Sequence, residues 1–367
     1  MDGPRTLLPD ERASLMHLVD DVFVPGEPGL MFRAFPQFFD AGNDLNHWVF
    51  VENGEVVAHA GMMTHDARIA GCAVRVGCVG AVASRESHRG QGLASRLMDL
   101  LCKSALERDM DFLLISGDRG LYRRMDAVPF AHEYTVTINA QAAAHAQHLP
   151  VRLVEADEQS LPAWEQAYAE KPAHFVRTRE DWHAQMCART GGMWTARFFS
   201  MHVGASCHGY IVAAKPNAEG QTDIIEFAGH PPAVQSAMAP LLQCVKAKTV
   251  RLRLQQTDGA LLNNLRVAGA NIAPGTTEGV LRLVRFAPFM DRLRPFIEKR
   301  VGHEAAEELR FEEKEGRCVF SDPANTFSLT PAEAAQVIFG GPEKRALPGI
   351  WNRIFPLPLL AYGINYV

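Results

Sequence analysis

The stretch "SHRGQGLAS" places two glycines one residue apart, directly after Arg89 and directly before a helical pattern. The first backbone N–H groups of a helix have no partner inside the helix, and the helix dipole makes that end partly positive. Glycine lets a ligand approach the backbone closely. We therefore expect a phosphate-sized anion to bind where a strand ending near Ser84 turns into a helix beginning near Gly92, with Arg89 adding positive charge.

The spacing of this turn separates it from two common phosphate motifs. It lacks the Gly-Lys-Ser/Thr ending of a Walker A loop and the G-x-G-x-x-G spacing of a dinucleotide fold. The spacing Arg89-x-x-Gly92-x-Ala94 instead resembles the acetyl-coenzyme A (acetyl-CoA) motif R/Q-x-x-G-x-G/A of the GNAT N-acetyltransferase superfamily. The order of strand, loop, motif and helix resembles that superfamily too. The alternative is a glycine turn that only starts a helix.

The resemblance implies a set of coenzyme contacts. Backbone N–H groups of the turn would cradle the pyrophosphate, and the strand before the turn would pair with the pantetheine amides. The implied contacts are Ala81, Val82, Ala83, Arg89, Gly90, Gln91, Gly92, Leu93, Ala94 and Ser95. Glu86 is a departure, because many members have proline there, and it affects the stiffness of the loop rather than the cradle.

A tyrosine in "GLYRRMDAVPF" matches the superfamily position next to the thioester sulfur. The resemblance implies that Tyr122 is the general acid. A thiol has a pKa of about 8.5 and tyrosine about 10, so an unperturbed tyrosine is protonated at neutral pH and can donate to the leaving thiolate. The alternative is a Tyr122 packed on the core. Asp126-Ala127 replaces the usual Gly-Phe, which leaves the local backbone geometry open.

The coarse element pattern predicts a mixed α/β fold. Asn53-Gly54 between two apolar runs predicts a hairpin, and Leu93, Leu97 and Leu101 predict a helix after the motif. "DFLLIS" is typical of a buried strand. Residues 141–150 read as a linker, and 151–285 repeat the earlier order of elements. Their turn before a helix, Gly229 to Pro232, has no R-x-x-G-x-G, so we expect no coenzyme there.

The complete layout resembles bacterial acetyltransferases of the enhanced-intracellular-survival type. That resemblance implies a GNAT domain at 1–140, a degenerate GNAT-like domain at 151–285, and a sterol-carrier-like domain at 286–367. Within the last, Thr330, Pro331 and Glu333 predict a capped helix, and Glu315-Gly316 predicts a hairpin turn. The resemblance also implies that members commonly form homo-oligomers.

The reaction needs a base, because an alkylamine with a pKa of about 10.4 is neutral in only about one molecule in 2,500 at neutral pH. In the resembled family the chain end enters the acetyl-transfer cleft and its carboxylate assists, which implies Val367 here. The alternative is a tail packed for stability alone. His59 and His132 are further base candidates, although a lone histidine in a strand is more often structural.

Composition sets the outer limits. The 367 residues carry a net charge of −5, which gives no reason to expect nucleic acid or an anionic membrane as partner. The seven cysteines show no C-x-x-C pair, and the histidines form no H-E-x-x-H, so we expect a reduced, cytoplasmic protein without metal. The late run "IFPLPLLAYGINYV" is too short to span a bilayer.

These observations favour an acetyl-CoA-dependent N-acetyltransferase that acts on a primary amine of a small molecule or peptide by direct attack. An aminoacyl or longer-chain acyl transferase is one alternative. A non-catalytic sensor that binds coenzyme A and lipid is another. The sequence does not identify the acceptor.

Overall fold

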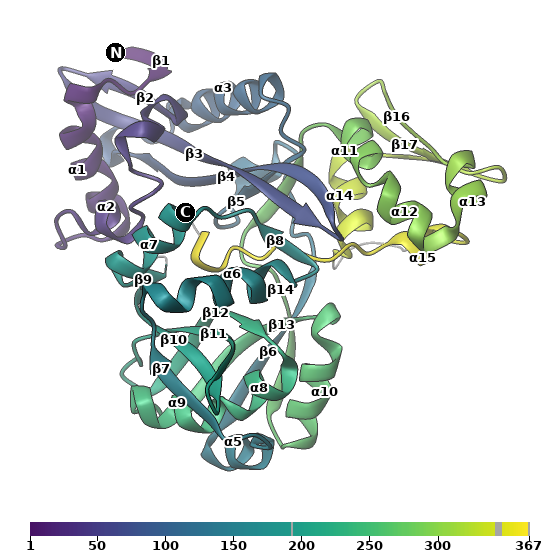
Figure 1. Cartoon of the computed structure of the whole chain (residues 1–367). Coiled ribbons are helices and arrows are strands. Elements are labelled where there is room, and N and C mark those ends of the chain that lie inside the picture. The colour runs from purple at the N-terminus through teal and green to yellow at the C-terminus, as the bar shows by residue number, and fades with distance from the viewer. Residues whose placement is uncertain (192–193, 342–346, 366–367) are drawn as a thin grey trace. The chain divides into compact units, whose positions relative to one another are not determined.

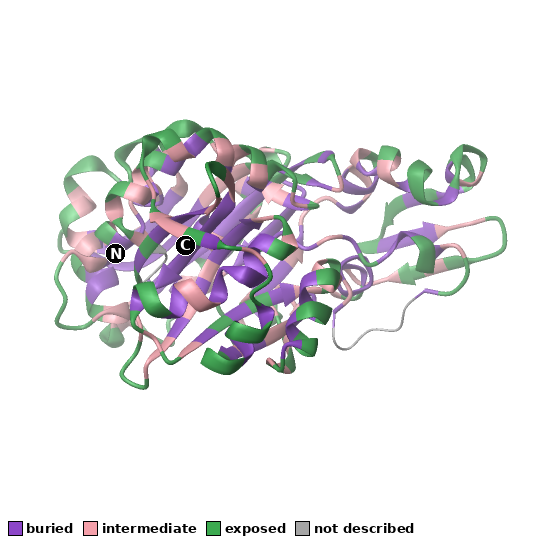
Figure 2. Ribbon diagram, turned by 60° about the horizontal axis from the view of Figure 1, so that its bottom comes forward, coloured by how far each residue is buried: buried purple, intermediate pink, exposed green. Residues whose placement is uncertain are grey.

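The computed structural model describes residues 1–191, 194–341 and 347–365 (Figure 1). The chain divides into two compact units. The first consists of Met1–Ala131 and Thr277–Leu357, and the second of His132–Thr276 with the segment that begins at Pro358. Strands are largely buried and helices show exposed outer faces (Figure 2), as expected of mixed α/β layers.

The first unit contains a sheet in the order β1-β2-β3-β4-β5-β15. Its strands are β1 (Asp2–Thr6), β2 (His47–Glu52), β3 (Glu55–Ile69), β4 (Cys72–Ser84), β5 (Phe112–Ile115) and β15 (Val280–Leu283). β4 and β5 are parallel and the other neighbours are antiparallel. The predicted hairpin is confirmed, because Asn53 (φ 52°) and Gly54 (φ 79°) form the turn between β2 and β3.

Helices cover this sheet. They are α1 (Arg12–Phe23), α2 (Leu30–Ala34), α3 (Leu93–Glu107) and α4 (Gly120–Arg123). The predicted helix after the glycine turn is α3, and its leucines Leu93, Leu97 and Leu101 are buried against the sheet at the expected four-residue spacing. The sequence thus places the start of α3 at the end of β4.

The C-terminal part of the first unit adds helices and a small antiparallel sheet in the order β16-β17-β18. Its elements are α11 (Phe286–Arg292), α12 (Arg294–Val301), α13 (His303–Glu308), β16 (Arg310–Lys314), β17 (Arg317–Ser321), β18 (Thr326–Leu329), α14 (Pro331–Phe339) and α15 (Trp351–Ile354). The predicted hairpin at Glu315-Gly316 and the Thr330 capping box are confirmed. Phe112 of β5 contacts Phe289 and Phe339, each at 5.5 Å between ring centroids, so this part packs on the first sheet.

The second unit contains a sheet in the order β14-β6-β13-β12-β11-β10-β7, with β9 beside β10. The strands of this sheet are β6 (His132–Asn139), β7 (Val151–Glu155), β9 (Thr190–Gly191), β10 (Trp194–Val203), β11 (Ser206–Ala214), β12 (Gln221–Gly229), β13 (Thr249–Gln255) and β14 (Asn271–Thr276). The short strand β8 (Ala173–Phe175) belongs to the same unit but not to this sheet. Its helices are α5 (Ala140–Ala146), α6 (Leu161–Ala169), α7 (Arg179–Ala188), α8 (Pro231–Ser236), α9 (Met238–Val245) and α10 (Gly259–Val267). As in the first sheet, the one parallel pair, β12 and β13, sits among antiparallel neighbours.

The expected linker at 141–150 is wrong in its first half. Residues 140–146 form α5, and Ala142, Ala143 and Ala146 are buried in the core of the second unit. Asn139 caps this helix by accepting the Ala142 N–H at 2.9 Å. An alanine-rich segment lacks the large apolar side chains that mark a core helix in a sequence, but small side chains let a helix approach a sheet closely.

Two strands each pair with the sheet built mainly by the other half of the chain. β6, which the range 1–140 places with the GNAT domain, pairs with β13 and β14 of the second sheet. β15, which the range 151–285 places with the second domain, pairs with β5 of the first sheet. Each sheet therefore places beside its inner parallel strand a strand from the other half of the sequence. Within the described ranges, no helix is long and apolar enough to cross a membrane.

Candidate active site

The pairing between β4 and β5 ends before β4 itself ends. The parallel register runs from Val76↔Phe112 to Val79↔Ile115, and the last bond joins the Ser116 N–H to the Val79 carbonyl at 3.0 Å. β4 continues to Ser84 without a partner on β5. The second half of β4 is therefore the place where an extended ligand can pair with strand backbone, as the sequence implied for Ala81, Val82 and Ala83.

A bulge shapes this half of β4. Gly61 pairs with Gly80 and His59 with Ala83, so β4 has one residue more than β3 over the same distance. Ala81 takes a left-handed conformation with φ 50°, which is unfavourable for a residue with a Cβ. The bulge changes the direction of the peptide groups along the second half of β4.

The start of α3 has the geometry that the glycine motif predicted. The first helical hydrogen bond runs from the Arg96 N–H to the Gly92 carbonyl at 3.1 Å, and in the described part of the chain the N–H groups of Leu93, Ala94 and Ser95 have no partner. Gly90 (φ 78°) and Gly92 (φ 74°) are left-handed, and an added Cβ at either would face open space. Arg89 through Gly92 are exposed, so a ligand can reach the turn that precedes these donors, which fits a pyrophosphate.

Tyr122 lies on α4 and is buried, with 2% of its surface exposed. Its ring belongs to the core cluster that contains Leu97 and Leu101. The departure at Asp126 is resolved, because Asp126 takes the left-handed conformation (φ 60°) that glycine would take and thereby closes the turn. The Ala127 N–H then bonds to the Tyr122 carbonyl at 3.1 Å. Tyr122 is held in place, and its catalytic role stays a prediction.

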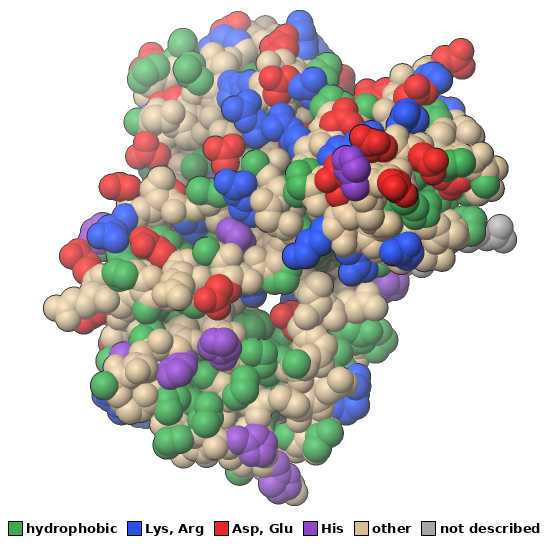
Figure 3. All heavy atoms as spheres, turned by 45° about the vertical axis from the view of Figure 1, so that its right-hand side comes forward, with side chains coloured by type: hydrophobic (Ala, Val, Ile, Leu, Met, Phe, Trp, Pro, Cys, Tyr) green, Lys and Arg blue, Asp and Glu red, His purple; other side chains and the backbone are tan. Residues whose placement is uncertain are grey.

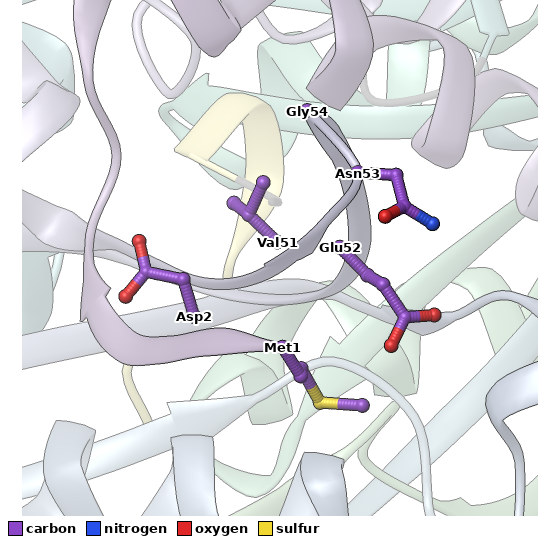
Figure 4. A pocket seen from close by; sticks show the side chains of 6 residues that line it. All are labelled: Met1, Asp2, Val51, Glu52, Asn53 and Gly54. Atoms are coloured by element: carbon purple, nitrogen blue, oxygen red, sulfur yellow. The ribbon is translucent and has the colours of Figure 1, made fainter.

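A pocket of about 430 Å³ joins α3 to α4. It is lined by Ser95, Asp99, Cys102, Leu121, Arg124, Met125, Asp126 and Arg282. Ser95 belongs to both the pocket and the predicted cradle, so the cradle continues into a hollow on the Tyr122 helix. A larger hollow of about 620 Å³ lies over the β2–β3 hairpin and the N-terminal strand (Figure 4). It contains none of the predicted contacts and no helix start, and we do not assign the coenzyme to it.

The corresponding turn of the second sheet is closed. α8 begins with Pro231 and Pro232, which have no N–H, and the Ala233 and Val234 N–H groups both bond to the His230 carbonyl at 2.9 and 3.0 Å. No donor of the first turn is left for a ligand. That this turn binds no coenzyme stays a prediction.

The C-terminal segment is anchored on the second unit by side chains that the sequence analysis missed. Gln255 bonds to both backbone groups of Leu359, at 2.9 and 3.2 Å. The Ile364 N–H donates to Glu226 at 3.1 Å. The Arg177 Nε donates to Asn365 at 2.7 Å. A charged residue within the apolar run "TDIIEFAG" was the available signal for Glu226.

Arg177 and Glu226 form a buried ion pair beneath this segment. The two guanidinium nitrogens of Arg177 meet the two carboxylate oxygens of Glu226 at 2.7 Å each, and Tyr210 donates to Glu226 at 2.5 Å. The Arg177 guanidinium also lies over Tyr168 and Trp182. Burial is the largest single effect and raises the pKa of Glu226. The charge of Arg177, together with the hydrogen bonds from Arg177, Tyr210 and the Ile364 N–H, outweighs it, so the pKa lies below its usual value.

The remaining predicted site residues are dispersed. His59 is buried in β3 of the first unit, whereas His132 begins β6 of the second and is exposed. Val367 lies outside the described residues. Among the residues that are described, no group of three or more His, Cys, Asp or Glu side chains is arranged to hold a metal ion.

Comparison with known proteins defines the class. The acetyltransferase (GNAT) domain family matches residues 4–129. The chain therefore carries a GNAT acetyltransferase domain and is an acyltransferase. Domains of this family use acetyl-CoA as cosubstrate and act on amine acceptors. No protein with curated function matches the chain.

Solved structures share the fold over most of the chain. A GCN5-related N-acetyltransferase from Anabaena variabilis is 14% identical with a TM-score of 0.63, covering 91% of this chain and 89% of its own. One from Kribbella flavida is 15% identical with a TM-score of 0.62, covering 91% and 88%. Eis1 from Mycobacterium abscessus is 14% identical with a TM-score of 0.61, covering 96% of both chains. At these identities the likeness concerns the fold.

Proposed function

We propose that this protein is an acetyl-CoA-dependent N-acetyltransferase that transfers the acetyl group to a primary amine by direct attack. The observation that carries the proposal is the row of unpartnered N–H groups at the start of α3, beside the unpaired half of β4. The Arg89–Ser95 turn would bind the pyrophosphate, and Ala81–Ala83 would pair with the pantetheine amides. Acetyl-CoA supplies a thioester, whose acyl carbon accepts the amine.

The residues of the chain then have to move two protons. As the C–N bond forms and the C–S bond breaks, the amine loses a proton and the thiolate gains one. Tyr122 is the proposed donor to the thiolate, since α4 follows β5 and a tyrosine hydroxyl can act as a general acid. Its burial among apolar side chains excludes water from the leaving group.

The proposed assistant for the amine is the carboxylate of Val367. A free α-carboxylate has a pKa of about 3.5 and is a weak base, so it would act through a water molecule, in a buried state, or by holding the cationic amine. The anchoring of Leu359, Ile364 and Asn365 on the second unit supports this role, because it fixes the chain shortly before its last residues. In this proposal the second GNAT-like domain positions the tail and binds no coenzyme.

The lipid-binding alternative has less support. The pocket on the C-terminal part, about 490 Å³, is lined by Arg294, Glu298, Ala306, Glu307 and Arg310. Charged groups of both signs are interspersed over this part of the surface (Figure 3). A sterol-carrier-like layout is retained as a proposal about its fold rather than about a lipid cargo.

The test is thiol release from acetyl-CoA with the purified protein and a panel of primary amines, including small polyamines, aminoglycosides and lysine peptides. We expect amine-dependent thiol release that Gly92→Asp abolishes. Saturable acetyl-CoA binding without turnover on any amine would favour the sensor. Turnover only with longer acyl-CoA donors would favour the acyl-transferase alternative.

A further inference from the structure

Two histidines connect the β2–β3 core to the bulge of β4. His47 Nδ1 lies 2.8 Å from His59 Nε2, and His59 Nδ1 lies 2.7 Å from the Ala81 carbonyl oxygen. At the other end, His47 Nε2 lies 2.8 Å from the Phe38 carbonyl oxygen. Both rings are buried, with at most 1% exposed. The row therefore contains two imidazoles between two carbonyl acceptors.

The row contains three short contacts, and each needs one proton. A neutral imidazole has one N–H, so two neutral rings supply two protons. Burial lowers the pKa of His47 to about 4 and that of His59 to about 3, so both rings are neutral at pH 7. Arg12, which is paired with Asp44, adds to the lowering at His47. One carbonyl at the ends therefore receives no proton from the pair.

Asn43 determines which of the two carbonyl groups, that of Phe38 or that of Ala81, receives no proton from the histidines. Its side-chain amide donates to the Phe38 carbonyl at 2.8 Å and lies 3.4 Å from His47 Nε2. The Phe38 carbonyl thus has a donor whichever tautomer His47 adopts, whereas the side-chain donor of the Ala81 carbonyl is His59. The lower-energy arrangement has His47 donate from Nδ1 to His59 and His59 donate from Nδ1 to Ala81. All protons then point toward the bulge.

We propose that His59, oriented by His47 and Asn43, is a positioning residue that fixes the Ala81–Val82 peptide at the proposed coenzyme site. The peptide is planar and trans, so a carbonyl held toward His59 turns the Val82 N–H to the opposite side. The left-handed conformation of Ala81 is unfavourable for a residue with a Cβ and persists only where its surroundings hold it. The inference rests on the proposed function, in which Ala81–Ala83 contact the coenzyme.

The packing around His47 holds the pair of histidines rigidly in place. The His47 ring stacks on Phe39 at 5.5 Å between centroids and meets Phe38 edge-on at 4.9 Å. Gly61 lies beside it, and a Cβ there would come within 2.8 Å of His47 Nδ1. The glycine therefore admits the ring at the spot where it must bond to His59. The remaining charged group that faces the row is Arg12, which Asp44 neutralises.

Two substitutions at one position separate the two bonds of His59. Asparagine places its amide nitrogen where Nδ1 was and keeps the donor to Ala81. Glutamine places its nitrogen near Nε2 and keeps only the side facing His47. We expect His59→Gln to lower kcat about 10–100-fold and His59→Asn less than about threefold, with the KM for acetyl-CoA nearly unchanged in both. Equal losses in the two variants would overturn the proposal, as would a normal kcat in His59→Gln.

Nitrogen NMR of the labelled wild-type protein tests the proton arrangement without any activity. We expect both histidines as Nδ1–H tautomers at pH 7, and Asn43→Leu should convert them to Nε2–H tautomers. An Nε2–H tautomer of His59 in the wild type would overturn the proposal.

If the His59 variants do not fold, Asn43→Leu, which leaves both rings in place, must still show the kcat loss. Wild-type protein that binds acetyl-CoA but turns over no amine would refute the proposed function. The tautomer result, and a shift of the Val82 amide signal on acetyl-CoA addition, would then still test whether His59 positions the Ala81–Val82 peptide.

Discussion

The two strand–helix turns of this protein, β4 to α3 and β12 to α8, occupy equivalent places in their sheets and differ in their donors. In both sheets the parallel pairing stops before the strand ends, at Val79 in β4 and at Asp223 in β12. After β4 the helix begins with left-handed Gly92 and free N–H groups. After β12 it begins with Pro231 and Pro232. An opening between strands is therefore a property of the fold, whereas a coenzyme site also requires the donors of the turn.

The largest expected effect is at the first turn itself. Gly92→Asp places a carboxylate where the pyrophosphate would lie, and two unit charges about 4 Å apart repel by about 4 kcal/mol near a protein surface. We expect acetyl-CoA affinity to fall by at least about 100-fold, with the fold intact. The measurement is calorimetric titration, which for the wild type should also give one coenzyme per chain.

The matched control for Gly92→Asp is His230→Asp at the start of α8. It adds the same charge to the closed turn and should leave acetyl-CoA affinity unchanged. A loss of affinity in this control, or a wild-type stoichiometry of two, would mean that the second turn also binds coenzyme.

The helices that follow the inner parallel strands, α4 after β5 and α10 after β13, also differ between the two sheets. α4 carries Tyr122, whereas α10 ("GALLNNLRV") has no tyrosine. Tyr122→Phe keeps the ring for packing and removes the donor. We expect kcat to fall about 10²–10⁴-fold with little change in acetyl-CoA affinity, measured under conditions where chemistry limits the rate. A fall of less than about threefold would identify Tyr122 as a packing residue.

The third test asks whether the second unit contributes through the tail. Adding one glycine after Val367 keeps every side chain and moves the carboxylate by up to about 3.5 Å. Since a 1 Å misplacement can cost about 100-fold, we expect a severe loss of kcat with an almost unchanged melting temperature. If the extended protein turns over normally, the tail is structural and the base lies elsewhere.

A last test distinguishes the buried polar groups of the two units by the pH at which each unit loses stability. His47 and His59 have folded pKa values below the unfolded value of about 6.5, so the unfolded state binds more protons below that pH. The first unit should lose stability as pH falls from 6.5 toward 4, by up to about 1.4 kcal/mol per pH unit per histidine. Glu226, whose pKa is lowered, should keep the second unit's network intact until the pH falls below about 4.3.

Hydrogen exchange, measured for individual peptides as a function of pH, follows the stability of both units in one experiment. Peptides of β2 and β3 should lose protection at higher pH than peptides of β12. Replacing His47 and His59 together by phenylalanine and leucine should remove the difference. Simultaneous loss of protection in both units of the wild type would contradict the assignment.

The features that the sequence predicted are those set by local chemistry. Asn53-Gly54, the Thr330 capping box and the turn at Gly92 each need particular backbone angles or donors at one place, and the residues report them directly. The exchange of β6 and β15 was not predictable, because an apolar strand has the same pattern whichever sheet it joins. Arg177 was missed for a related reason, since a single arginine before a helix gives no sign that it is buried.

The strand exchange has a consequence for how the protein is made. β5 leaves the ribosome with β4 on one side and nothing on the other, and its second neighbour, β15, is encoded after the entire second sheet. At about 5–20 residues per second, the open edge waits roughly ten to thirty seconds for that strand. During this interval Phe112–Ile115 is an unpaired apolar edge of the kind that aggregates or recruits chaperones. Completion of the first sheet is therefore tied to synthesis of the entire second sheet.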